Sequence, residues 1–296
     1  MQQAILITAY KNLSQLHMIA DIFSDYSNYH IYIHIDRKSK IQDNDIEELL
    51  RRKNIKLVSR RYKVNWGGFN HLKAILHLAE EALKNSNIAY MHAISGQDIP
   101  VKAPDFITDF LNNNSGKEFI DHVELPYESW QGGGMNRILN YNLYDTLNAS
   151  SKWQRKIIKF ISFVQEKANI HRKLPENFPK IYGGGTWWTL SSASIQYVLN
   201  YVRLNPTFMK AFDYSFCAEE IVFQTIIMNS HFKDNVVNDD LRYIVWSERN
   251  GSNPANLDDT DFEKILASDN LFARKFDSSA SINVLNKLYQ SIVESN

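Results

Sequence analysis

Short β-rich runs alternate with helical stretches through residues 4–112, and this alternation constrains the fold more than any other feature of the chain. The pattern predicts strands at 4–7, 31–35, 55–58 and 89–94 and helices at 13–23, 70–83 and 106–112. Strands that alternate with helices form a mostly parallel sheet covered by helices, and such sheets bind ligands beyond the carboxyl ends of their strands. The sequence therefore predicts an α/β fold whose informative residues follow the strands.

Polar turns follow three of the expected strands. The second strand leads into Asp36-Arg37-Lys38-Ser39, the third into VNWGGF (64–69) and the fourth into SGQDIP (95–100). Because these strands are expected to be parallel, the three turns should lie at one edge of the sheet. None of the glycine-rich turns has the spacing of a Walker or dinucleotide-binding motif.

The size and composition of the chain indicate one globular domain that spans residues 1–296. The chain is 44% hydrophobic and contains no low-complexity linker or internal repeat. Lys+Arg (33) balances Asp+Glu (33), so no overall field attracts nucleic acid, which is not an expected partner. Cys217 is the only cysteine, which excludes an intrachain disulfide and a cysteine zinc site and suits a reducing cytoplasm.

Membrane association is expected to be peripheral at most. No uninterrupted apolar run approaches the roughly 20 residues of a transmembrane helix, and the N-terminal residues lead straight into a strand without a signal-peptide pattern. Residues 153–164 are basic and apolar at helical spacing, which leaves attachment to a membrane surface open. We prefer a helix that packs on its own domain.

Two adjacent carboxylates, Glu219 and Glu220, precede an apolar helical run that begins at Ile221. A single acid at a helix start is explained by capping, which contributes about 0.3–1 kcal/mol. Side chains one position apart on a helix point roughly 100° apart, so one acid can cap or form an ion pair while the other faces a cleft as a general base. The pair is therefore either catalytic or purely structural.

No metal site is expected. The nine histidines show no HExxH or comparable spacing. The acidic group Asp258-Asp259-Thr260-Asp261 could bind a divalent cation, but it precedes an amphipathic segment. We interpret it as a helix N-cap and first turn.

Six segments, in order along the whole chain, resemble one enzyme family. They are IYIHIDRKS (31–39), VNWGGF (64–69), SGQDIP (95–100), GGGTWWTL (183–190), FCAEEIVFQT (216–225) and LFARKFD (271–277). Each is weak alone, but together they resemble the core-2/I-branching β-1,6-N-acetylglucosaminyltransferases, a family that also contains the peptide O-xylosyltransferases. The resemblance implies a GT-A-like nucleotide-sugar transferase fold, an inverting mechanism, a UDP-sugar donor and no dependence on a metal or other cofactor.

The resemblance also implies roles for the charged residues. Glu220 stands at the position of the catalytic base, and Glu219 beside it would position or cap the turn and border the acceptor. Lys275 and Arg274 would neutralise the leaving diphosphate in place of a metal. The turn that begins at Asp36 agrees, because it lacks the acid-any-acid pair that holds manganese. The alternative is that Arg274 and Lys275 flank a strand and face solvent.

Donor contacts are expected in the first half of the chain, residues 1–122. Asp36 matches the residue that meets the uracil or ribose, and Trp66, Gly67 and Gly68 would shape the nucleotide pocket, with glycine allowing the backbone to approach the ligand. Asp98 stands where an acid of the family approaches the donor sugar. Its alternative role is to form the turn before the next proline.

Acceptor contacts and catalysis are expected in the second half, residues 123–296. Trp187 and Trp188 offer flat faces on which a sugar can stack, although core packing is the alternative for at least one of them, since neighbouring strand residues point to opposite faces. Glu124 and Arg137 lie in the region where the family contacts its acceptor.

The resulting expectation is a bacterial-type cytoplasmic glycosyltransferase that moves N-acetylglucosamine, or alternatively xylose, from UDP to a saccharide or glycolipid acceptor. Action at the inner face of a membrane is left open. We base this expectation on the single cysteine and on the lack of an anchor pattern among the given residues, in contrast to the animal Golgi members. Ala218 and Val245 depart from the family pattern, which leaves open a glycan- or nucleotide-binding protein without catalysis. A sugar donor built on another nucleotide is also open.

Overall fold

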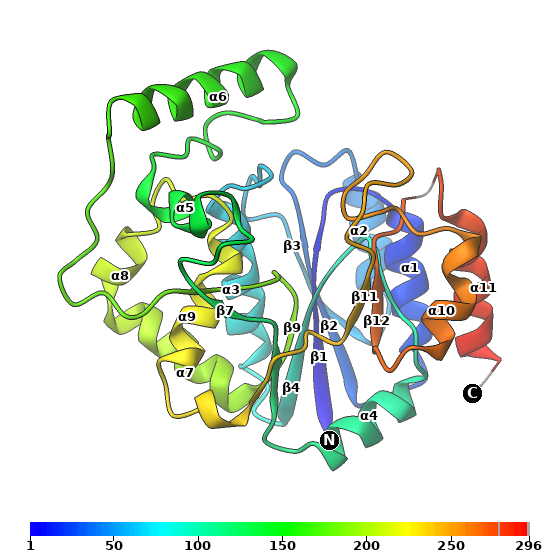
Figure 1. The fold of residues 1–296 in the computed structure, drawn as a ribbon. Helices are drawn as coiled ribbons and strands as arrows, with labels where there is room; N and C mark the ends of the chain where they lie inside the picture. The colour runs from blue at the N-terminus through cyan, green and yellow to red at the C-terminus, as the bar shows by residue number, and fades with distance from the viewer. Residues whose placement is uncertain (278, 295–296) are drawn as a thin grey trace.

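The computed structural model describes residues 1–277 and 279–294, and its centre is a seven-stranded sheet (Figure 1). The strands lie in the order β10 (Val236–Val237), β6 (Glu118–Ile120), β9 (Trp188–Ser191), β4 (Ile88–Ser95), β1 (Gln2–Ala9), β2 (Tyr29–Ile35) and β3 (Ile55–Ser59). β4, β1, β2 and β3 are parallel, whereas β9 is antiparallel to both of its neighbours. The predicted α/β architecture, a mostly parallel central sheet flanked by helices, is confirmed.

Two smaller sheets lie beside the central one. β11 (Arg242–Ile244) pairs in parallel with β12 (Phe272–Arg274), which pairs antiparallel with β5 (Asp98–Pro100). β7 (Val123–Glu124) and β8 (Tyr182–Gly183) form a two-stranded ribbon. The three-stranded sheet joins a segment near the C-terminus to the turn that follows β4, so residues far apart in the sequence become neighbours.

Helices cover both faces of the central sheet (Figure 1). One hydrophobic cluster includes side chains of α1 (Leu13–Ile22), α2 (Asp43–Leu50), α4 (Pro104–Asn113), α10 (Phe262–Ala267) and α11 (Ile282–Val293). The other includes side chains of α3 (Asn70–Ala82), α5 (Asn136–Leu139), α7 (Ser192–Leu204), α8 (Pro206–Lys210) and α9 (Val222–Met228). α6 (Lys152–Lys167) lies apart from these layers (Figure 1). The short 3-10 turns are η1 (Gln131–Gly134), η2 (Ala218–Glu220), η3 (Lys233–Asn235) and η4 (Asp259–Asp261).

α6 is an exception among the helices, because none of its side chains belongs to either hydrophobic cluster. Only Ile158 and Gln165 of α6 are buried, and Trp153 is 69% exposed. The expectation that residues 153–164 pack on their own domain is therefore wrong for most of their apolar side chains. Within the residues that the structure describes, no helix combines the length and the apolar composition needed to cross a bilayer.

Alternating side chains of β1 supply both hydrophobic clusters. Ile5 and Ile7 point into the cluster that contains α1, whereas Ala4 and Leu6 point into the cluster that contains α3. A strand buried on both faces needs a nearly continuous apolar run, which is why the β1 sequence is so hydrophobic. Full burial of one such Ile or Leu stabilises the fold by about 1.5–3 kcal/mol.

The predicted strands and helices of the first 113 residues are present, with two additions, α2 and the short strand β5 within the expected turn at 95–100. α2 was not expected, because Leu49 is its only buried residue and its remaining pattern is polar. It begins with a capping box between Gln42 and Asp45. β8 and β9 lie close together in the sequence but belong to different sheets. The functional boundary proposed between residues 122 and 123 stays a prediction.

Gly184, between β8 and β9, is a point of close backbone contact. A Cβ atom added there would lie 1.9 Å from the carbonyl oxygen of Asp121, which is closer than any real contact. We expect Gly184→Ala to lower the free energy of unfolding by about 1–3 kcal/mol, because the backbone must move to admit the methyl group. Urea unfolding measures this change.

Gly185→Ala is the matched control, since a Cβ atom at Gly185 would lie 3.4 Å from its nearest neighbour, a carboxylate oxygen of Asp240. We expect this variant to unfold at nearly the wild-type urea concentration. Equal effects of the two substitutions would contradict the role assigned to Gly184.

Candidate active site

The two adjacent acids occupy a short turn before a buried helix. Glu219 and Glu220 end η2, here called the acid turn, and every residue of the following helix α9 is buried, as the apolar run predicts. Cys217, directly before the acid turn, has a φ of 51°, and its amide donates to the carbonyl oxygen of Gly67 at 2.9 Å. The two carboxylates leave the turn toward different partners.

Glu220 points to the partly open side of the turn. Its carboxylate forms an ion pair with Arg137, its side chain is 25% exposed, and the hydroxyl of Thr186 lies 3.5 Å from Oε1. Burial raises the pKa of the Glu220 carboxyl above its ordinary value, Arg137 opposes this increase, and Glu219 adds to it. A partly exposed carboxylate with a raised pKa is a candidate general base.

Glu219 points into the protein. Its side chain is 4% exposed, and its Oε1 lies 2.9 Å from Nδ1 of His71. The other ring nitrogen of His71 lies 3.1 Å from the hydroxyl of Thr8, at the end of β1. These contacts fix the acid turn to α3 and to the central sheet. They support a positioning role for Glu219 and leave its side chain little surface for an acceptor.

Arg274 and Lys275, here called the cation pair, lie at the end of β12. The Arg274 side chain is 12% exposed, its Cζ lies 4.2 Å from the ring centroid of Trp187, and its Nε lies 3.5 Å from Oδ1 of Asp98. Lys275 Nζ donates to the hydroxyl of Ser252 at 3.2 Å. The alternative that both cations face solvent is wrong, because both side chains are partly buried against these partners.

A third cation lies near the pair. Lys11, in the loop after β1, forms an ion pair of 2.5 Å with Asp277. Burial lowers the pKa of Lys275, and the positive charges of Arg274 and Lys11 lower it further, whereas Asp277 and Asp98 oppose the decrease. The mutual repulsion of these cations would be relieved by an anion bound between them.

The acid turn and the cation pair belong to one site. Arg274 lies over the ring of Trp187, whose centroid is 6.4 Å from that of His71, and His71 in turn contacts Glu219. Trp187 comes directly before β9, so the central sheet holds it between the two groups. The structure thus brings together residues from four separate parts of the sequence.

Asp98 is a buried carboxylate that contacts Arg274 of the cation pair. Its side chain is completely buried, and its carboxylate accepts hydrogen bonds from the amide of Ser95 at 2.6 Å and from the Ser95 hydroxyl at 3.0 Å. Burial raises the pKa of Asp98, and Arg274 opposes this increase. Asp98 was expected either to approach the donor sugar or to form the turn before Pro100. The structure supports the role in the turn, and Asp98 additionally orients Arg274. A buried carboxylate has no surface for the donor sugar.

The two glycines in the turn after β3 lie close to other side chains of the protein. Gly67 has a φ of 78°, and a Cβ atom there would lie 2.4 Å from the ring of Phe216, while one at Gly68 would lie 2.6 Å from Oδ1 of Asp145. The close approach is thus to protein side chains, rather than to a ligand as expected. Trp66 is 65% exposed and meets Phe216 edge-on, so its contact with a nucleotide stays a prediction.

Asp36 joins two of the turns at the carboxyl edge of the sheet. Its Oδ1 accepts the amides of Lys38 at 3.0 Å and of Val64 at 3.1 Å, and its Oδ2 lies 3.5 Å from the ammonium of Lys38. The Asp36 side chain is 10% exposed. The predicted position at the edge is confirmed, and the predicted donor contact is untested.

Two of the acceptor candidates lie away from the site's contacts. Trp188 is completely buried and packs on Phe223 with a centroid separation of 4.9 Å, so the stacking prediction is wrong for Trp188 and the core alternative holds. Trp187 is 8% exposed, and stacking of a sugar on it stays a prediction. Glu124 is 54% exposed and pairs with Lys180 at 3.1 Å.

The acidic group at 258–261 caps a helix, as predicted. The Asp258 side chain accepts the amide of Thr260, a capping box joins Asp258 to Asp261, and Arg249 pairs with Asp261. Across residues 1–277 and 279–294, no group of three or more His, Cys, Asp or Glu is arranged to hold a metal ion.

Sequence reasoning missed two residues that support the site. His71 is a lone histidine at the start of α3, and nothing in its local pattern indicates its contact with the acid turn. Arg242 is buried and donates to the Thr189 hydroxyl and to the carbonyl oxygens of Ala93 and Trp188. Burial lowers the pKa of Arg242 to about 10. The one sequence signal for these hydrogen bonds is a charged residue in a short, otherwise uncharged strand, and this signal is weak.

A hollow of about 280 Å³ lies beside the site, between α3 and the loops at 142–146 and 213–214. Its lining includes Phe69, Lys73, Asp145 and Asp213, and it includes none of the predicted site residues. We therefore assign the chemistry by the contacts of the acid turn and the cation pair, and not by this hollow.

We compared the chain with protein-family models and with known proteins. A family model described as Core-2/I-Branching enzyme matches residues 4–266. The chain is 25% identical to "Xylosyltransferase oxt" of Drosophila pseudoobscura pseudoobscura over 93% of this chain and 31% of that protein. It is also 25% identical to "Beta-glucuronosyltransferase GlcAT14A" of Arabidopsis thaliana, over 84% of this chain and 55% of that protein. The chain thus spans less than a third of the xylosyltransferase and about half of the glucuronosyltransferase.

Among solved structures, one of S. aureus TarS in complex with UDP matches with a TM-score of 0.33 and 9% sequence identity. The match covers 40% of this chain and 35% of that chain. This similarity is too low to support an inference about the present protein.

The contact between His71 and Glu219 predicts a measurable coupling. We expect His71→Leu to lower the free energy of unfolding by about 1–3 kcal/mol, because it leaves a nearly buried carboxylate without its partner. Urea unfolding of His71→Leu, Glu219→Leu and the double variant measures the pair. The double variant should lose less than the sum of the single variants, and strictly additive losses would show that the two residues are not coupled.

Proposed function

The chain belongs to the Core-2/I-branching enzyme family, and on that premise we propose that it is a glycosyltransferase that moves a sugar from a nucleotide-sugar donor to an acceptor hydroxyl. The observation that carries the proposal is the path of contacts from the acid turn, through His71 and Trp187, to Arg274. Such a transfer requires a base for the acceptor proton and positive charge for the leaving diphosphate. The site offers both groups, held apart by an aromatic ring.

Glu220 is the proposed general base. In an inverting transfer, the carboxylate takes the proton of the acceptor hydroxyl while the acceptor oxygen bonds to the anomeric carbon. The bond between that carbon and the diphosphate oxygen breaks, and its electron pair stays on the diphosphate. The ion pair with Arg137 opposes the effect of burial on the pKa of Glu220 and so favours the ionised form that a base needs.

The cation pair is the proposed binding site for the diphosphate of UDP. The planar guanidinium of Arg274 can contact two phosphate oxygens, and Asp98 and Trp187 hold its orientation. Lys275 supplies a more mobile point charge. Arg37 and Lys38 stand in the turn where a metal-binding member of this fold would carry its second acid. We therefore include transfer without a metal ion or other cofactor in the proposal.

The nucleotide and the acceptor are assigned to opposite sides of this site. Asp36 and Trp66, in residues 1–122, would contact the nucleotide, and the exposed ring of Trp66 supports this role. A saccharide or glycolipid acceptor would enter from residues 123–296, beside Glu220 and Arg137. The single cysteine supports a cytoplasmic place of action.

Two donor sugars fit the proposal. The sequence resemblance implies N-acetylglucosamine, whereas the relative named as a xylosyltransferase favours xylose as a second candidate. Both place UDP on the cation pair and the acceptor hydroxyl beside Glu220. A binding protein without catalysis would keep the cation pair but release no UDP from any donor.

Glu220→Gln tests the base. Release of UDP from UDP-N-acetylglucosamine, UDP-xylose and UDP-glucuronic acid, each with a panel of mono- and oligosaccharide acceptors, measures turnover. We expect kcat to fall by about 10²–10⁴-fold, because the amide cannot accept the proton, while donor affinity changes little.

The matched control is Glu263→Gln, an exposed acid on α10, which should keep wild-type turnover. Turnover of Glu220→Gln at the wild-type rate would exclude Glu220 as the base. Absence of UDP release by the wild type with every donor and acceptor would contradict catalysis and favour the binding protein.

Arg137→Gln tests the electrostatics of the base. Arg137 lowers the pKa of Glu220, so its removal should raise that pKa further. Activity that needs ionised Glu220 is lost as pH falls through this pKa, and the acid limb of kcat/KM should therefore move to higher pH. Arg203→Gln, on the exposed end of α7, is the control. An acid limb that stays in place or moves to lower pH would contradict the pairing.

A further inference from the structure

Helix α6 presents large apolar side chains to solvent. Trp153 is 69% exposed, Phe160 66% and Phe163 54%. In Figure 1, α6 lies at the top of the molecule, apart from the layers that cover the sheet. Exposed aromatic side chains gathered on one helix indicate a binding surface, because soluble proteins rarely leave a contiguous apolar patch without a function.

The apolar side chains form one stripe along the outer face of α6. Trp153, Ile157, Phe160 and Val164 follow the spacing i, i+4, i+7 and i+11, which places them above one another on a helix. Phe163 lies beside this stripe, and Nζ of Lys167 lies 5.8 Å from the centroid of the Phe163 ring. The stripe continues over most of the helix length.

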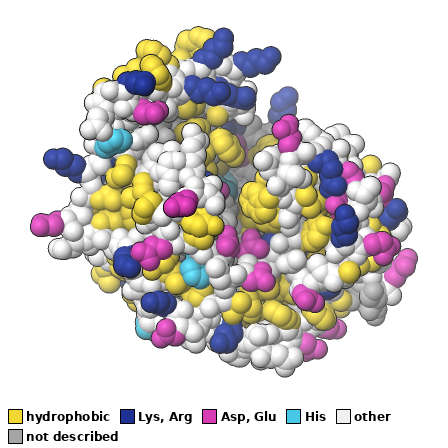
Figure 2. Space-filling view, viewed as in Figure 1, with side chains coloured by type: hydrophobic (Ala, Val, Ile, Leu, Met, Phe, Trp, Pro, Cys, Tyr) yellow, Lys and Arg dark blue, Asp and Glu magenta, His cyan; other side chains and the backbone are white. Residues whose placement is uncertain are grey.

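Positive charge accompanies the stripe. α6 carries a single acid, Glu166, against a larger set of basic residues, whereas Lys+Arg and Asp+Glu are equal in the whole chain. Figure 2 shows Lys and Arg together with hydrophobic side chains at the top of the molecule, where Figure 1 draws α6. The basic residues of α6 are Lys152, Arg155, Lys156, Lys159 and Lys167.

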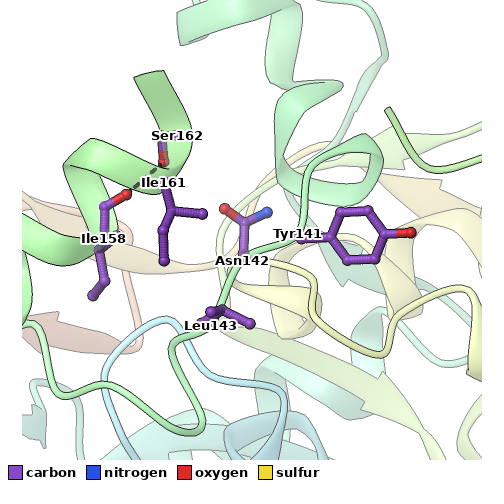
Figure 3. A pocket seen from close by; sticks show the side chains of 6 residues that line it. All are labelled: Tyr141, Asn142, Leu143, Ile158, Ile161 and Ser162. Carbon is purple, nitrogen blue, oxygen red and sulfur yellow. Dashed lines mark hydrogen bonds between the residues drawn. The ribbon is translucent and has the colours of Figure 1, made fainter. Parts of the chain in front are cut away.

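The opposite face of α6 is fixed to the protein. Figure 3 shows Ile161 directed at Asn142 and Leu143 in the loop before α6. The amide of Tyr141 donates to Oε1 of Gln165 at 2.7 Å, and the Gln165 amide group donates back to the Tyr141 carbonyl at 3.2 Å. These contacts hold the helix so that the apolar stripe faces outward.

We propose that α6 docks the protein on an anionic lipid bilayer, with Trp153 and Phe160 in the boundary between headgroups and acyl chains. Helices that lie in this boundary carry Trp, Phe or Leu on one face and Lys or Arg on the other. The basic side chains provide charge complementarity to lipid phosphates. A symmetric dimer through the same face would bring two positively charged helices together, which disfavours a second copy of the chain as the occupant.

Cosedimentation of the full chain with vesicles tests this inference. We expect binding to phosphatidylcholine vesicles that contain phosphatidylglycerol and much weaker binding to phosphatidylcholine alone. Trp153→Ser/Phe160→Ser should weaken binding to the anionic vesicles by at least about tenfold, and Lys156→Glu/Lys159→Glu should do the same. All four side chains are exposed, so both variants should keep the wild-type circular dichroism spectrum.

Leu204→Ser and Lys233→Glu are the matched controls, because both side chains are exposed away from α6, and both variants should bind like the wild type. No binding of the wild type to anionic vesicles would overturn the inference, and so would unchanged binding of both α6 variants. Concentration-dependent dimers without lipid that Trp153→Ser/Phe160→Ser abolishes would also overturn it, by assigning the stripe to a second copy. None of these readouts depends on transferase activity.

Discussion

The close approach of Phe216 to Gly67 is the constraint on which the candidate site depends. The Phe216 ring occupies the position that a side chain at residue 67 would need, and the next residue, Cys217, donates its amide to the Gly67 carbonyl. A side chain at position 67 would be strained by the φ of 78° and would require the Phe216 ring to move. Gly67 thus fixes where the chain enters the acid turn, from which Glu219 contacts His71.

The site keeps its opposite charges apart. Glu220 pairs with Arg137, and Arg274 is held by the buried Asp98, so Glu220 and Arg274 do not neutralise each other. The ring of Trp187 separates the cation pair from the acid turn. A donor that carries negative charge on its diphosphate can therefore meet the cations while the base stays available for the acceptor.

Local patterns predicted the parallel strands and the polar turns at their carboxyl ends, because alternation and turn residues are local properties. They could not place Trp188 on the core face, since two neighbouring aromatic residues give no sign of which one is buried. The contacts of His71 and Arg242 join distant segments, so only the fold reveals them. The pattern of α6 is the same for a helix that packs on its own domain and for one that faces outward, and the structure shows that most of its apolar side chains face outward.

Thermal unfolding with nucleotides tests the proposed donor site most directly. Wild type and Lys275→Ala would be measured with UDP, GDP and CMP, each with chelator and with manganese. Ligand at about a hundred times its Kd adds roughly 2.7 kcal/mol of stability and raises Tm by several degrees. We expect a UDP-selective increase in Tm that persists with chelator and is reduced in Lys275→Ala. An increase that requires manganese, that is equal for all three nucleotides or that Lys275→Ala leaves unchanged would contradict a metal-independent diphosphate site on the cation pair.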